Sequence, residues 1–129
     1  MFTGIVQGLA TVSELNRRGE FMSVKVQFPI GSLSAVEVGA SIALNGVCLT
    51  VTQFSGDWAM FDVIDETLDC TSLGTLCVEE HINFERAATF GSEIGGHLLS
   101  GHIVDTVTVR SREESDDNCT LKIQVPRQW

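Results

Sequence analysis

The chain has 129 residues and a mass of 14.0 kDa, enough for one ordinary domain and part of a second. Hydrophobic residues at 43% and charged residues at 19% exclude disordered, collagen-like and coiled-coil chains. Eight Lys and Arg against 17 Asp and Glu give a net charge of −9, which disfavours nucleic acid as a partner because clustered cations bind a phosphate backbone.

No apolar stretch approaches the roughly 18–20 residues that a membrane helix needs, and the opening MFTGIVQG lacks the cationic start of a secretion signal. We therefore expect a cytoplasmic protein without a membrane partner. The four cysteines show no CxxC spacing and only ordinary density, so free thiols are expected at Cys48, Cys70, Cys77 and Cys119.

Alternating apolar and polar residues predict short strands along the first two thirds of the chain. In the segment Phe21–Phe28, Val24 and Val26 share one face with Phe28, and the strand ends at Pro29. Turn signals such as Asn45-Gly46 separate the segments. Strands at this spacing indicate a small closed barrel, and we place them at Gly4–Val12, Phe21–Phe28, Ala40–Asn45, Val47–Phe54, Trp58–Ile64 and Ile82–Arg86.

Helices are expected to be few and short. The segments Gly31–Val36 and Thr67–Leu73 each suit a turn or two, with Thr67 as the N-cap of the second. The polar, acidic run Arg112–Asn118 is typical of a solvated hairpin loop.

An internal repeat organises the chain. A shift of 97 positions aligns Thr3-Gly4 with Ser100-Gly101 and the run VKVQFP, which starts at Val24, with LKIQVP, which starts at Leu121. Residues 1–97 are therefore predicted to form one module, and residues 98–129 the opening two strands of another. Two strands without partners expose backbone and apolar surface, so we expect this chain to be part of a longer polypeptide.

The motifs GxGxxG, GxxxxGK[ST], HExxH and GxSxG are absent. The spacing of His81, His97 and His102 is poor for metal ligation, so no metal is expected; structural hydrogen bonds and proton transfer both stay open for the last two. Cys48 and Thr50 share one strand face. Their side chains could either contact a polar organic ligand or simply pack in the barrel wall.

Four motifs together resemble the riboflavin synthase family: MFTGIV from Met1, NGVCLTV from Asn45, Phe61-Asp62 with Glu66-Thr67-Leu68, and IGGHLLSGH from Ile94. The resemblance covers the whole chain. It implies an all-β fold, a six-stranded antiparallel Greek-key barrel followed by the first strands of a second, similar barrel. Each barrel of the family binds one molecule of 6,7-dimethyl-8-ribityllumazine.

The resemblance also implies which residues touch the ligand, with Phe2 matched beside them. Val47, often a second cysteine in the family, and Asp65, commonly Lys or Pro, are departures, and Asp65 makes the pocket mouth more acidic. Cys48, Thr50 and His102 are the catalytic candidates, with their roles left open. The implied ligand contacts are Gly4, Ile5, Val6, Ser41, Cys48, Leu49, Thr50, Asp62, Val63, Ile64, Asp65, Glu66, Thr67, Gly101, His102 and Ile103.

The implied reaction is a dismutation in which one lumazine gives a four-carbon unit to another, yielding riboflavin and 5-amino-6-ribitylamino-2,4(1H,3H)-pyrimidinedione without a cofactor.

The complete polypeptide is expected to be a homotrimer with each site between two subunits. The fragment is expected to be a dimer that binds ligand without turnover. Two alternatives are a non-catalytic antenna protein that carries lumazine or flavin, and an unrelated flavin-reductase-type barrel.

Overall fold

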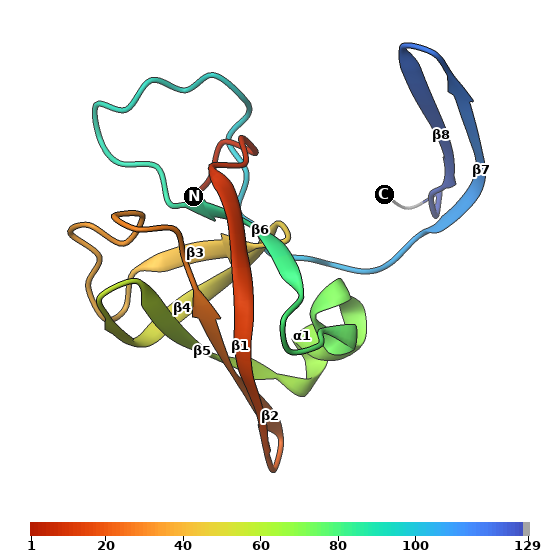
Figure 1. Ribbon diagram of the computed structural model, residues 1–129. Helices are drawn as coiled ribbons and strands as arrows, with labels where there is room; N and C mark the ends of the chain where they lie inside the picture. The colour runs from red at the N-terminus through yellow and green to blue at the C-terminus, as the bar shows by residue number, and fades with distance from the viewer. Residues whose placement is uncertain (128–129) are drawn as a thin grey trace.

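The computed structural model describes residues 1–127, and six of its strands close into a barrel (Figure 1). Around the barrel the strands follow the order β1-β2-β5-β4-β3-β6, and every neighbouring pair is antiparallel. The bounds are β1 Gly8–Arg18, β2 Phe21–Gln27, β3 Ser41–Leu44, β4 Val47–Ser55, β5 Trp58–Ile64 and β6 His81–Arg86.

The connectivity is a Greek key. The strands β3, β4 and β5 follow one another as neighbours, and β6 then returns to lie beside β3. Asn45 and Gly46 make the tight β3–β4 turn with φ of 47° and 83°, the left-handed region that such a two-residue hairpin requires. The predicted all-β class and six-stranded antiparallel barrel are confirmed.

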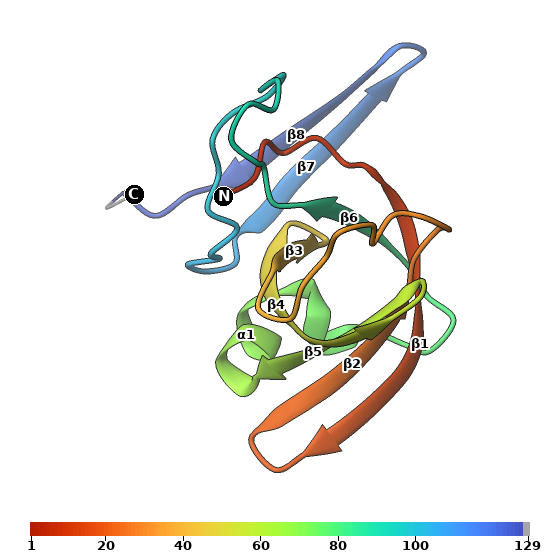
Figure 2. The same cartoon turned by 90° about the vertical axis from the view of Figure 1, so that its left-hand side faces the viewer.

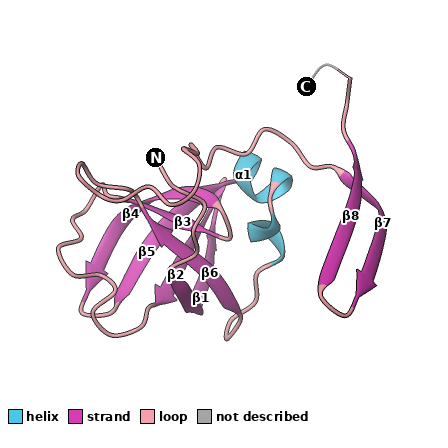
Figure 3. Cartoon of the chain, turned by 90° about the horizontal axis from the view of Figure 1, so that it is seen from above, coloured by secondary structure: helices cyan, strands magenta, loops and turns pink. Residues whose placement is uncertain are grey.

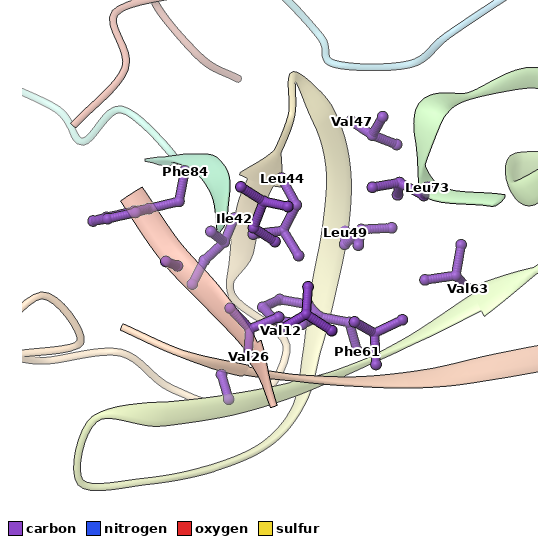
Figure 4. Packing of buried hydrophobic residues seen from close by; sticks show 14 of the residues in the cluster. Val12, Val26, Ile42, Leu44, Val47, Leu49, Phe61, Val63, Leu73 and Phe84 are labelled. Carbon is purple, nitrogen blue, oxygen red and sulfur yellow. The ribbon is translucent and has the colours of Figure 1, made fainter. Parts of the chain in front are cut away.

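Hydrophobic side chains fill the inside of the barrel (Figure 4). Val12, Val26 and Phe61 are wholly buried there, as the alternation along their strands predicts. In β4 the buried positions are Val47, Leu49 and Val51, so Cys48 and Thr50 lie on the outer face. The lumen therefore has no room for a ligand, and a site that uses Cys48 must lie outside the barrel.

Several predicted boundaries were wrong. The first strand was expected over Gly4–Val12 but spans Gly8–Arg18, because residues 2–4 bond to Leu99 and to the side chain of Glu85 instead of to the backbone of a barrel strand. The segment Gly31–Val36 forms turns rather than a helix, with Gly31 at a φ of 82°.

The second predicted helix, Thr67–Leu73, is instead two short elements that lie over one end of the barrel. Helix α1 spans Asp65–Cys70 and the 3-10 helix η1 spans Ser72–Thr75. Ile64 is the N-cap of α1 and makes no side-chain cap bond, so Thr67 is not the N-cap that the sequence predicted. A threonine does cap η1, where Thr71 accepts a hydrogen bond from the backbone N–H of Leu73.

A second sheet of two strands, β7 (Thr108–Ser115) and β8 (Asn118–Gln124), stands apart from the barrel (Figures 1 and 3). Figure 2 shows both strands as one long hairpin. The predicted loop over Arg112–Asn118 was too long, because the strands continue to Asp116-Asp117.

The β7–β8 hairpin has the same pairing register as β1–β2. Thr11 pairs with Gln27 in the barrel, and Thr108, 97 positions later, pairs with Gln124. The register shift between Val12 and Glu14 recurs between Val109 and Ser111, again 97 positions later. The two hairpins therefore agree in their irregularity as well as in their regular pairs.

All four cysteines are free, as predicted. Over residues 1–127, none of the helices combines the length and the apolar character that a membrane crossing requires.

Candidate functional site

A cavity of about 160 Å³ lies on the outside of the barrel, between the start of β4, helix α1 and the segment after Ser100. It brings together five of the residues implied by the resemblance, although they come from three separate parts of the chain. The lining consists of Val47, Cys48, Thr67, Cys70, Thr71, Gly101, His102 and Ile103.

The wall formed by β4 follows from the strand's alternation. Since Val47, Leu49 and Val51 point into the core, Cys48 is left half-buried against the cavity and Thr50 is exposed beyond it. The backbone N–H of Cys48 donates to the carbonyl of Gly101 at 2.9 Å. This bond joins the segment after Ser100 directly to the barrel strand.

Gly101 is a position that only glycine fits. Its φ is +76°, and a Cβ there would lie 2.9 Å from the Cβ of Cys48. The backbone before it is bound by the N-terminal residues, since Phe2 and Leu99 exchange hydrogen bonds of 2.8 and 2.9 Å. The glycine and this bridge together hold His102 and Ile103 at the cavity.

The same N-terminal residues are bound by a buried carboxylate. Glu85 is 7% exposed and accepts hydrogen bonds from the backbone N–H of Thr3 at 2.6 Å, the hydroxyl of Thr3 at 2.7 Å and the N–H of Gly4 at 3.0 Å. These bonds satisfy a group that is costly to bury unpaired. Glu85 thus supports the site indirectly, because it holds the N-terminal residues that hydrogen-bond to His97 and Leu99.

The segment Asp62–Thr67 contributes Thr67 to the cavity, while several of its other side chains are occupied elsewhere. Asp62 accepts a hydrogen bond from the hydroxyl of Ser23 at 2.6 Å, and Asp65 forms an ion pair with Arg17 at 2.5 Å. Val63 is buried in the core, whereas Ile64 and Glu66 are exposed.

Residues 4–6 do not line the 160 Å³ cavity that contains Cys48 and Thr67. Gly4 lines a separate cavity of about 260 Å³ that also includes His102 and Ile103. Ile5 lines another cavity, of about 610 Å³, and Val6 is exposed. The predicted contact set is therefore divided: Gly4 meets residues 101–103 at the second cavity, whereas Ile5 and Val6 line none of the cavities that include His102.

The remaining predicted contacts sit on neighbouring strands. Ser41 pairs with Thr50 across β3 and β4, outside the lining of the 160 Å³ cavity. Leu49 is buried and contributes its side chain to the core. Within residues 1–127 no three His, Cys, Asp or Glu side chains are grouped so that they could hold a metal ion.

Comparison with known proteins identifies the family. The model of the lumazine binding domain matches residues 3–87. The chain belongs to the lumazine-binding domain family. This match covers the whole barrel and ends just after β6.

Relatives of this lumazine-binding chain include riboflavin synthase of Escherichia coli (strain K12), which is 48% identical over 125 residues. That alignment covers 97% of this chain and 59% of the relative, so the chain spans well under two thirds of the length of the curated relatives it matches. Riboflavin synthase of Bacillus subtilis (strain 168) is 37% identical over 117 residues, covering 91% of this chain and 54% of the relative.

Solved structures similar to the lumazine-binding chain include LumP complexed with riboflavin. The identity is 34% and the TM-score 0.80, covering 99% of this chain and 69% of the other. The fold is therefore that of a protein known to hold a flavin.

Sequence reasoning missed Cys70 and Thr71 in the cavity wall and the supporting role of Glu85. The alternation along β6 does not predict that Glu85 is buried. The preceding Phe84 is buried, and a neighbour on the opposite strand face is then expected to be exposed. The Glu85 partners Thr3 and Gly4 lie 82 and 81 positions away in sequence, a distance at which no local pattern operates.

Proposed function

We propose that this chain binds 6,7-dimethyl-8-ribityllumazine or riboflavin on the outer face of its barrel and forms the N-terminal part of a riboflavin synthase. The convergence of Cys48, Thr67 and His102 on one cavity carries this proposal, in a chain that is 48% identical to a riboflavin synthase. The complete polypeptide then converts two lumazines into riboflavin and 5-amino-6-ribitylamino-2,4(1H,3H)-pyrimidinedione.

The chemistry of the site suits such a ligand. A lumazine presents a flat ring with an amide-like edge, which backbone N–H and C=O groups can pair, and a ribityl chain of hydroxyls. Hydroxyls and a carboxylate are available nearby at Thr50, Thr67, Ser41 and Glu66. The 160 Å³ cavity takes part of the ligand, and the rest lies over the exposed face of β4 at Thr50.

Catalysis in this proposal depends mainly on orientation. The 7-methyl group of lumazine is acidic because its carbanion is delocalised into the ring, so holding two ligands face to face supplies much of the rate without a cofactor. The side chains of Cys48, Thr50 and His102 are the candidates for proton transfer. Of these, Cys48 and His102 line the cavity itself.

The shared register of the two hairpins supports the proposed arrangement of modules. Residues 98–129 begin a second module that repeats residues 1–97, as the pairing from Thr108 to Ser115 supports. In β8 the exposed Leu121 and Ile123 occupy the positions of Val24 and Val26, which are buried in the barrel. The rest of the second module would cover them.

The repeat also explains why the predicted contacts are divided. Residues 4–6 correspond to residues 101–103 under the shift of 97 positions. Because residues 101–103 complete the cavity on the first barrel, residues 4–6 complete the equivalent site on the second. The two sites meet between subunits of a homotrimer, and the 129-residue chain, without a second barrel, binds ligand as a dimer but does not turn it over.

Fluorescence titration of the 129-residue chain with riboflavin and with the ribityllumazine tests the binding proposal. Saturable quenching or a spectral shift is expected, and an unchanged spectrum would refute it. Turnover assays on the complete polypeptide and on the 129-residue chain test the rest, with riboflavin formed only by the former.

A non-catalytic carrier is the second candidate. It is favoured by the similarity to two structures of LumP, with TM-scores of 0.80 and 0.76. The second of these structures is LumP complexed with 6,7-dimethyl-8-(1'-D-ribityl) lumazine. It is 30% identical to this chain, and the match covers 99% of this chain and 68% of that one. Ligand binding by a complete polypeptide that forms no riboflavin would establish this alternative.

A further inference from the structure

The β1–β2 hairpin holds the segment Asp62–Thr67 from outside the cavity. Ser23 on β2 donates its hydroxyl to Asp62 at 2.6 Å, and the carbonyl of Glu20 in the hairpin turn accepts from the backbone N–H of Asp65 at 3.1 Å. Arg17 on β1 pairs with the carboxylate of Asp65 at 2.5 Å. None of the three hairpin residues lines the 160 Å³ cavity.

Ser23 is one of two buried polar or charged residues among residues 1–127, at 5% exposure. A hydroxyl buried at this level needs a partner, and the carboxylate of Asp62 supplies a charge-assisted one. The bond links two residues that face each other in the β2–β5 ladder, two residues before β5 ends and the chain enters α1. The end of β5 is therefore held to β2 by a side-chain bond as well as by the backbone ladder between the two strands.

These contacts support the start of α1, because its N-cap residue makes no side-chain cap bond. Ile64 has no side chain that could accept from the first turn, and the helix is only six residues long. Asp65, its first residue, is held through its N–H and its carboxylate by Glu20 and Arg17. Thr67 follows two residues later and lines the cavity.

We propose that Arg17 and Ser23 are positioning residues for the ligand site, acting through Asp65 and Asp62 to fix where Thr67 and Glu66 meet the ligand. This inference rests on the proposed function. Neither residue touches the ligand.

A double-mutant cycle in the 129-residue chain tests Arg17, with riboflavin as the fluorescent probe. Arg17→Ala is expected to raise Kd about threefold to fivefold, the range of an exposed ion pair. The matched control Arg18→Ala removes the same charge from the neighbouring position, which has no ion pair among the described residues, and changes Kd by less than about twofold. In an Asp65→Asn background, Arg17→Ala adds no further loss.

Ser23 is tested by a conservative rescue. Ser23→Ala is expected to raise Kd about fivefold, whereas Ser23→Thr retains the hydroxyl and keeps Kd within about twofold of the unaltered chain. Circular dichroism at the titration temperature shows that each variant is folded. If Ser23→Thr also binds about fivefold more weakly, the hydroxyl is not what positions the segment.

The outcomes separate this inference from the function it rests on. Binding by the unaltered chain with Kd unaffected by Arg17→Ala and by Ser23→Ala overturns the positioning roles alone. An Arg17→Ala loss that persists in the Asp65→Asn background assigns its effect to something other than Asp65. Failure of the unaltered chain to bind overturns the proposed function together with this inference.

Discussion

Gly101 and Cys48 are joined by a 2.9 Å hydrogen bond and by a backbone approach so close that a Cβ on Gly101 would meet the Cβ of Cys48 at 2.9 Å. These residues are 53 positions apart, and they connect β4 to a segment that precedes the β7–β8 hairpin. The cavity between them exists because this segment lies flat on the strand.

Gly101→Ala should weaken ligand binding about tenfold. A side chain at a φ of +76° costs about 1–2 kcal/mol, and the contact with Cys48 pushes the segment and His102 away from the cavity. Fluorescence titration measures the loss. Gly95→Ala is the matched control, since Gly95 has no neighbour within 4 Å and no positive φ. Equal affinity in the two variants would contradict this role of Gly101.

Glu85→Gln should destabilise the chain by about 2 kcal/mol. The carboxylate accepts three hydrogen bonds from Thr3 and Gly4, whereas an amide offers one oxygen and turns an N–H toward these donors. Thermal unfolding should show a Tm lower by several degrees. The control Glu93→Gln makes the same chemical change at an exposed position and should leave Tm unchanged.

Glu66→Gln should weaken ligand binding by about 1–3 kcal/mol, the scale of a lost charge-assisted hydrogen bond to the ribityl chain. Asp69→Asn removes the same charge from an exposed position on α1 and should leave the affinity unchanged. A titration in which both variants bind as tightly as the unaltered chain would remove Glu66 from the site.

Ile123→Asn tests the repeat through stability. In the 129-residue chain Ile123 is exposed, so the substitution should change the free energy of unfolding by less than about 0.5 kcal/mol. In the complete polypeptide it should cost about 3 kcal/mol, because the equivalent Val26 is wholly buried. Lys122→Asn on the opposite face is the control. A similarly small cost of Ile123→Asn in both polypeptides would argue against a second barrel.

Local patterns located the strands well where alternation was clear. The segment Trp58–Ile64 was predicted with its observed bounds, because buried Ala59, Phe61 and Val63 alternate with more exposed neighbours. The first strand was misplaced because nothing local shows that Thr3 and Gly4 bond to Glu85. Likewise, nothing in the sequence links Arg17 to Asp65. Their ion pair forms only because the β1–β2 hairpin extends to the start of α1.

The candidate site was only partly predictable. The resemblance named Cys48, Thr67 and His102, which line one cavity in the structure, together with residues 4–6, which do not line it. Alternation could place Cys48 and Thr50 on one face without saying whether that face was inward or outward. The burial of Val47 and Leu49, which depends on the closed barrel, decides it.

Phe2 and Leu99 exchange backbone hydrogen bonds, so the folded barrel includes residues beyond residue 87, where the match to the family ends. Cutting the chain after residue 97, the end of the proposed first module, would remove Leu99 from Phe2 and leave the backbone N–H of Cys48 without its partner Gly101. A barrel transplanted into another protein should therefore extend through Ile103, so that it keeps the residues that bond to Phe2 and Cys48.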